Sequence, residues 1–80
     1  MKISWIKVEK DNKNFWIAER LGMPVYRLKQ PEDVDDTISR LVNQNYKTIV
    51  LSNEVAGFSE DIIKKYRNSK GVNIVISTRK

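Results

Sequence analysis

The alternation of two hydrophobic periods is the feature that most constrains the fold of this chain. Short runs rich in β-branched and aromatic residues predict four strands, over residues 3–8, 25–28, 46–51 and 72–76. Between them lie three segments with apolar residues at helical spacing, over residues 15–21, 31–42 and 53–67. Because strands that alternate with helices need crossover connections, the order βαβαβαβ predicts a parallel sheet.

The expected architecture is a small doubly wound α/β domain with flavodoxin-like topology, strand order 2-1-3-4 and helices on both faces of the sheet. The 80 residues leave room for one modest core, so residues 1–80 are expected to form a single domain. The third strand is nearly continuous in Thr, Ile and Val, which is typical of a strand buried on both faces. The fourth strand is expected to be buried as well.

Several residues mark the ends of the predicted helices. The polar stretch 9–14 offers Asp and Asn caps for the first helix, and Gly22 stands where a C-terminal glycine belongs. Pro31 suits the first position of the second helix. Asn53 is expected to cap the third helix, and Ser59 to restart it after a break.

Catalytic chemistry has few residues to use in this sequence. The chain contains neither Cys nor His, so it lacks disulfides, thiolate metal sites and the commonest general base. No glycine follows the first strand, which excludes dinucleotide and P-loop motifs, and Ser52 stands where a receiver domain needs a phosphoacceptor Asp. The acidic residues at the start of the second helix complement the helix dipole: Glu32, Asp33, Asp35 and Asp36. We expect no catalytic, cofactor-binding or metal-binding residues, and a protein that is not an enzyme.

Composition and charge place the chain among soluble domains. Apolar residues make up 40% and charged residues 31%, and no apolar run approaches the roughly 20 residues that a membrane span needs. The first residues lack the apolar block of a signal peptide, so a cytoplasmic location is expected. The net charge of +5 comes from scattered Lys and Arg, which is typical of a solvated surface.

Exposed aromatic residues are the best candidates for binding a protein partner. Three successive apolar residues, Phe15, Trp16 and Ile17, cannot all face one sheet from a helix, and Trp is enriched at interface hot spots. Phe58 follows a predicted helix break and is a second exposed candidate. The predicted partner-binding residues are these two aromatics and three cations: Trp16, Phe58, Arg20, Lys64 and Lys65.

The order of elements and several segments resemble the F subunit of the V-type/A-type rotary ATPases. Residues 31–33 (Pro-Glu-Asp) open the second helix as in that family, and residues 49–56 (IVLSNEVA) match its apolar run, capping residue, Glu and Ala. Residues 62–66 and 72–76 are similar to the family's third helix and fourth strand, and residues 18–22 loosely match the end of its first helix. The resemblance covers essentially the whole chain through patterns of residue class.

That resemblance implies a non-catalytic part of the central rotor stalk, which packs against a long coiled-coil stalk subunit and modulates the coupling of ATPase activity to proton transport. Two features of this sequence depart from the family's pattern. The first strand ends in Val8-Glu9-Lys10 instead of Gly-Asp, and no C-terminal helical segment follows before Lys80. These departures leave two interpretations: a shortened relative with a different partner, or convergence within a common small fold.

Two other functions are left open by the sequence. A basic nucleic-acid-binding module would use the cations of the last third of the chain: Lys64, Lys65, Arg67, Lys70, Arg79 and Lys80. A small regulatory domain would bind its ligand at the carboxyl ends of the strands. The absence of glycine from the first turn counts against the second of these.

Overall fold

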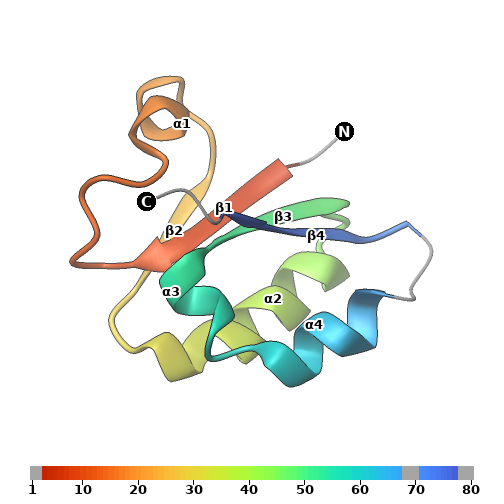
Figure 1. The fold of residues 1–80 in the computed structure, drawn as a ribbon. Helices are drawn as coiled ribbons and strands as arrows, with labels where there is room; N and C mark the ends of the chain where they lie inside the picture. Colours follow the sequence, from red (N-terminus) through yellow and green to blue (C-terminus); the bar gives the residue numbers. More distant parts are fainter. Residues whose placement is uncertain (1–2, 68–70, 78–80) are drawn as a thin grey trace.

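The computed structural model of the chain, which describes residues 3–67 and 71–77, confirms the predicted parallel sheet. Its strands are β1 (Ile3–Val8), β2 (Val25–Leu28), β3 (Thr48–Ser52) and β4 (Asn73–Ser77). They lie in the order β2-β1-β3-β4, and each neighbouring pair is parallel (Figure 1). The third strand begins two residues later than expected, and the fourth is shifted by one residue.

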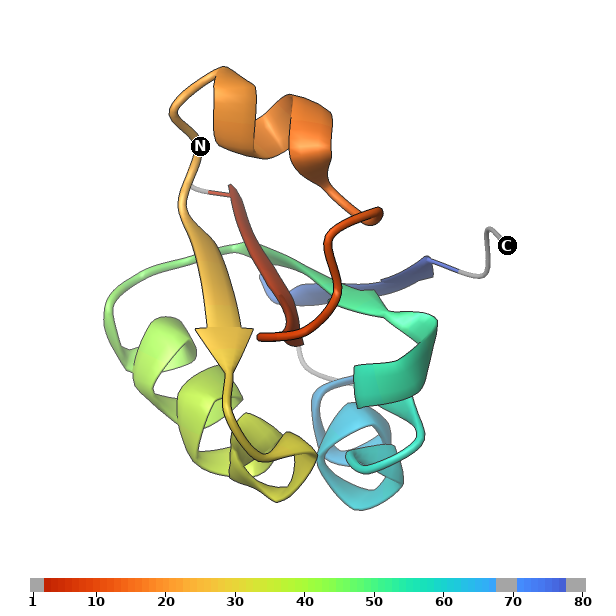
Figure 2. The same ribbon diagram turned by 90° about the vertical axis from the view of Figure 1, so that its left-hand side faces the viewer.

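Helices cover the two faces of this sheet unequally. The helical elements are α1 (Trp16–Arg20), the 3-10 turn η1 (Pro31–Asp33), α2 (Val34–Asn43), α3 (Asn53–Ala56) and α4 (Glu60–Arg67). The longer helices, α2 and α4, pack on one face, and the short α1 lies on the other (Figures 1 and 2). Helices on both faces are therefore confirmed, but the face with α1 is only partly covered.

The hydrophobic core lies on the α2–α4 side of the sheet. Alternate strand residues point to that side because side chains along a strand alternate between faces. The buried cluster takes residues from the sheet and from α2, α3 and α4: Ile6, Val8, Leu28, Val34, Ile38, Leu41, Ile49, Leu51, Val55, Ala56, Ile62 and Ile63. Within the described part of the chain, no residue of α1 belongs to this cluster, so other contacts hold α1 in place.

Several helix ends differ from the sequence prediction. The cap of α3 is Ser52 instead of Asn53, since the Ser52 hydroxyl accepts the N–H of Val55 at 3.4 Å. Ser59 does precede α4, but its hydroxyl donates back to the carbonyls of Val55 and Ala56. The expectation for Gly22 is confirmed, because it follows the end of α1 with φ of +77°.

The prediction for the start of the first helix is wrong. No side chain of residues 9–14 caps it; α1 begins after Phe15, whose φ of 63° lies in the left-handed region, and it contains five residues. The prediction of a buried fourth strand is also wrong. Val75 is 47% exposed, because β4 is an edge strand with a helix on one face only. The prediction for the third strand is confirmed, since Ile49, Val50 and Leu51 are all buried.

Candidate functional site

An ion pair between a buried lysine and a partly exposed glutamate ties α1 to the sheet. Lys7 lies near the carboxyl end of β1 and is fully buried, yet its ammonium group donates to Glu19 Oε1 at 2.7 Å. The same group donates to the backbone carbonyl of Asn14, also at 2.7 Å. Arg27 on β2 donates to the second carboxylate oxygen of Glu19. The bonds from Lys7 and then from Arg27 lower the pKa of the Glu19 carboxyl below its usual value.

The loop before α1 is folded around Asp11. Its carboxylate accepts the backbone N–H groups of Lys13 and Asn14 at 3.0 and 2.9 Å, and the side-chain amide of Asn14 at 2.6 Å. Burial raises the pKa of Asp11, but these hydrogen bonds together with the charge of Lys7 outweigh it, so the net shift is downward. Asp11, which lies in the stretch predicted to cap the first helix, thus stabilises the loop before α1 and does not cap the first turn of the helix.

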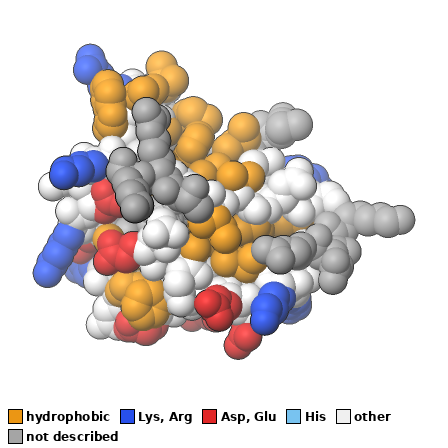
Figure 3. Space-filling model, in the orientation of Figure 1, with side chains coloured by type: hydrophobic (Ala, Val, Ile, Leu, Met, Phe, Trp, Pro, Cys, Tyr) orange, Lys and Arg blue, Asp and Glu red, His pale blue; other side chains and the backbone are white. Residues whose placement is uncertain are grey.

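The ion pair fixes which side of α1 points outward. At about 100° per residue, positions 16, 17, 20 and 21 fall within one arc of roughly 140°. Trp16 is 50% exposed, Ile17 57% and Leu21 72%, and Arg20 is exposed among them. Ala18 and Glu19 occupy the inward side. We call Trp16, Ile17, Arg20 and Leu21 the α1 surface; Figure 3 shows hydrophobic side chains gathered around α1 at the top of the molecule.

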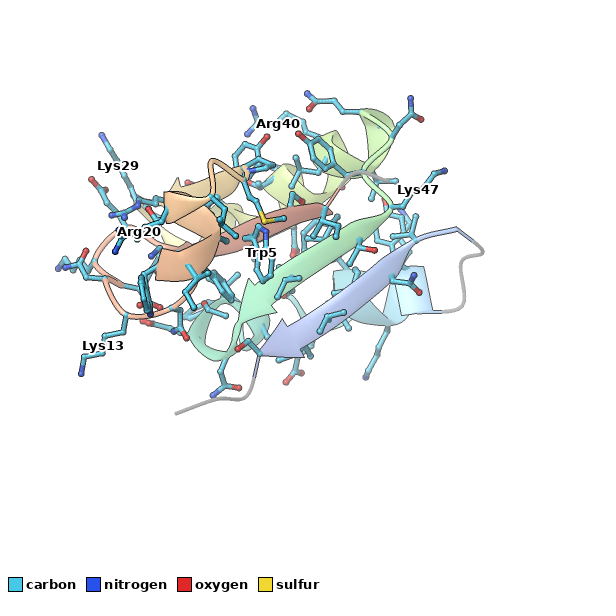
Figure 4. All side chains as sticks on the ribbon, turned by 90° about the horizontal axis from the view of Figure 1, so that it is seen from above. Trp5, Lys13, Arg20, Lys29, Arg40 and Lys47 are labelled. Atoms are coloured by element: carbon cyan, nitrogen blue, oxygen red, sulfur yellow. The ribbon has the colours of Figure 1, made fainter. Side chains whose placement is uncertain are left out.

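Aromatic packing provides the second attachment of α1. The rings of Trp5 on β1 and Phe15 lie 5.1 Å apart between centroids, in a tilted arrangement. Viewed from above, α1 lies over β1 and β2, whereas β3 and β4 extend clear of it (Figure 4). The helix therefore covers only part of this face of the sheet and turns the α1 surface, an apolar ridge, outward. One aromatic pair and one ion-pair network attach it to the sheet.

The predicted partner-binding residues do not come together. Trp16 and Arg20 lie on α1, as part of the α1 surface. Phe58 lies between α3 and α4 and is 51% exposed, and Lys64 and Lys65 are exposed on α4. Since the sheet separates α1 from α4, the five residues divide between opposite sides of the molecule (Figure 1). Sequence patterns could not predict this separation, because they do not show which face of the sheet each helix covers.

Two hollows lie between strands and helices, and one of them reaches Leu28 at the carboxyl end of β2. One of about 410 Å³ is lined by residues of β3, α4 and β4, and another of about 240 Å³ lies between β2 and α2. Near the carboxyl end of β1, Lys7 donates to Glu19 and Asp11 accepts from Asn14, so both charged side chains already have partners. Among residues 3–67 and 71–77, no group of three or more acidic side chains is placed to hold a metal ion.

The residues of the nucleic-acid hypothesis are only partly described. Lys70, Arg79 and Lys80 lie outside the described residues, and Lys64 and Lys65 share α4 with the carboxylates of Glu60 and Asp61. Nucleic-acid binding therefore stays a prediction.

Comparisons with known proteins do not identify a family for this chain. No protein-family model, curated protein or solved structure matches the chain significantly. None of the helices in the described ranges has the length and apolar character to cross a membrane.

Proposed function

We propose that this chain is a non-catalytic protein-interaction domain that binds its partner through the α1 surface. The observation that carries this proposal is the exposure of three large apolar side chains: Trp16 and Ile17 on a five-residue helix, and Leu21 directly after it. A helix of five residues has little stability of its own, and α1 contributes nothing to the buried cluster. The ion pair from Lys7 holds it in one orientation, which reduces the entropy lost on binding.

The partner with the matching chemistry is a helix with an apolar stripe and flanking carboxylates. A short apolar ridge fits the groove between side chains of a long helix, and a large aromatic residue such as Trp16 is the usual anchor of such a contact. Arg20 lies within the ridge and Lys13 is exposed before it, so both are available to acidic side chains of the partner. The resemblance to rotary ATPase F subunits favours the same class of partner, a long coiled-coil stalk subunit, in the cytoplasm.

The proposal is tested by purifying the tagged chain from its native cells and identifying what is retained. We expect a long α-helical protein in stoichiometric amount. The double variant Ile17→Asp, Leu21→Asp should lose this protein, because two charges replace the apolar ridge. Phe58→Asp is the matched control, since Phe58 is a half-exposed apolar residue on the opposite side of the sheet.

Two results would contradict the proposal. Retention of the partner by the double variant, together with its loss from Phe58→Asp, would place the contact on the α3–α4 side. Recovery of nucleic acid in place of a helical protein, released by moderate salt, would favour the basic nucleic-acid-binding module.

A further inference from the structure

The two edges of the sheet differ in how they are protected. Proteins usually shield an edge strand by keeping it short, by placing charges or proline on it, or by covering it. The β2 edge has four residues, with the charged Arg27 among them. The β4 edge has five residues, Asn-Ile-Val-Ile-Ser, without a charge or a proline. Among the described residues no strand pairs with its outer side, so β4 is an unshielded edge.

The backbone of β4 presents its free groups at two defined residues. Asn73 donates its N–H to the carbonyl of Lys47, the residue before β3, at 2.7 Å. In a parallel pair the N–H and C=O of alternate residues point to opposite sides of the strand. Asn73, Val75 and Ser77 therefore point their backbone groups towards β3, and Ile74 and Ile76 point theirs outward.

The order of residue types along β4 is symmetric about Val75: a polar residue, Ile, Val, Ile and a polar residue. We infer that β4 pairs antiparallel with β4 of a second copy, around a two-fold axis at Val75, so that two sheets become one. Ile74 then opposes Ile76 of the second copy as a hydrogen-bonded pair, which uses the outward groups of both residues. Val75 opposes itself, and Asn73 opposes Ser77.

Each face of the joined sheet would match across the axis. Ile74 and Ile76 are half-buried against the core on the helix side, and they would meet their equivalents there. On the other face the exposed Val75 side chains would cover each other. A two-fold interface of this kind is self-complementary and closes after two copies, which limits further growth along this edge.

The charges of α4 complement those of its copy in this arrangement. The helix begins with Glu60 and Asp61 and continues with Lys64 and Lys65, all exposed. It packs beneath β4 (Figure 1), and a two-fold axis through the β4 pair makes the two α4 helices antiparallel neighbours. The acidic first turn of one then faces the basic later turns of the other, which favours this antiparallel pairing over a parallel one.

Cysteine cross-linking tests the pairing and its register directly. The chain has no Cys of its own, so any disulfide comes from the introduced residue. In Val75→Cys the two Cα atoms of a non-hydrogen-bonded antiparallel pair would lie about 4.5 Å apart, within disulfide range. In the control Ser77→Cys they would be roughly 13 Å apart, because each opposes residue 73. We expect Val75→Cys to cross-link at least about tenfold faster than Ser77→Cys, since only it meets disulfide geometry.

A second pair of variants tests the interface without cross-linking. Val75→Lys places two like charges on the axis and should sediment as a monomer with an unchanged circular dichroism spectrum. Val75→Thr, which keeps the β-branched shape, should remain a dimer. Equal cross-linking at positions 75 and 77, a dimeric Val75→Lys, or a parent chain that sediments as a monomer at all concentrations would overturn the inference. Pairing of β4 with a strand of another protein would overturn it as well.

Discussion

The ammonium group of Lys7 and the carboxylate of Glu19 meet at 2.7 Å, and this contact orients a helix that the core does not hold. Lys7 is fully buried in β1, and Glu19 reaches it from α1. Because Glu19 points inward, its neighbours at positions 16, 17, 20 and 21 must point outward. The exposed apolar ridge is therefore a consequence of one ion pair and the helical geometry around it.

The two partners of this ion pair should differ in their effect on stability. Glu19→Ala leaves a buried ammonium group without its counter-charge, and an unpaired buried charge is strongly destabilising. Lys7→Met replaces the charge with an apolar side chain of similar length, and Glu19 keeps its bond to Arg27. We expect a larger fall in Tm for Glu19→Ala than for Lys7→Met in thermal unfolding. The reverse order would show that Lys7 acts chiefly through its own packing.

Stability should fall in acid because of Glu19 and Asp11. Both carboxyls have a pKa in the folded chain below the values of about 4.3 for Glu and 3.9 for Asp in unfolded chains. Their contribution is complete above those unfolded values and is lost as the pH falls towards the folded ones. In Tm measurements from pH 7 to pH 3, Glu19→Gln and Asp11→Asn should each weaken the dependence on pH. A dependence identical to that of the parent chain would contradict the assignment.

Two glycines should respond differently to alanine. Gly22 has φ of +77°, which an L-residue adopts at a cost of roughly 1–2 kcal/mol. A Cβ there would meet nothing within 4 Å, so backbone strain is the whole effect of Gly22→Ala. Gly57 has φ of −64°, and its added Cβ would make only an ordinary contact with the Glu54 carbonyl. Gly57→Ala should be neutral or stabilise by about 0.5 kcal/mol in denaturant unfolding. Equal losses would contradict this account.

Removal of one hydroxyl should stabilise the fold. Ser4 is fully buried on β1, and its Oγ has no hydrogen-bond partner among the described residues. An unpaired buried hydroxyl costs about 1–3 kcal/mol, so Ser4→Ala should raise the free energy of unfolding by up to about that amount. Urea titration measures the change. A destabilised Ser4→Ala would indicate that the hydroxyl is bonded in the native chain.

Much of the fold was accessible from the sequence because its signals are local. The β-branched runs, the stripe of α2 and the position of Gly22 all depend on near neighbours in the chain, and each prediction is confirmed. The exposure of β4 was missed because the burial of a strand depends on what lies beside it in the sheet. The run Val-Asn-Ile-Val-Ile has the same pattern whether the strand is central or at an edge.

The attachment of α1 was missed for a related reason. Lys7 interrupts an apolar strand and shares a face with Trp5, which was a signal that a partner charge would have to cover it. Which carboxylate does so depends on how the loop around Asp11 returns α1 to the sheet, and no local pattern encodes that path. The division of the predicted partner-binding residues between two sides likewise needed the tertiary structure.

Site-specific photo-cross-linking in native cells tests the central claim most directly. A photoreactive phenylalanine analogue placed at Ile17, in the middle of the α1 surface, should cross-link to one protein with a long coiled-coil segment. The same analogue at Phe58, as exposed but on the opposite side of the sheet, should not cross-link to that protein. A single coiled-coil adduct at position 17 alone is the predicted result. No adduct at position 17, or the same adduct at both positions, would contradict a partner bound through α1.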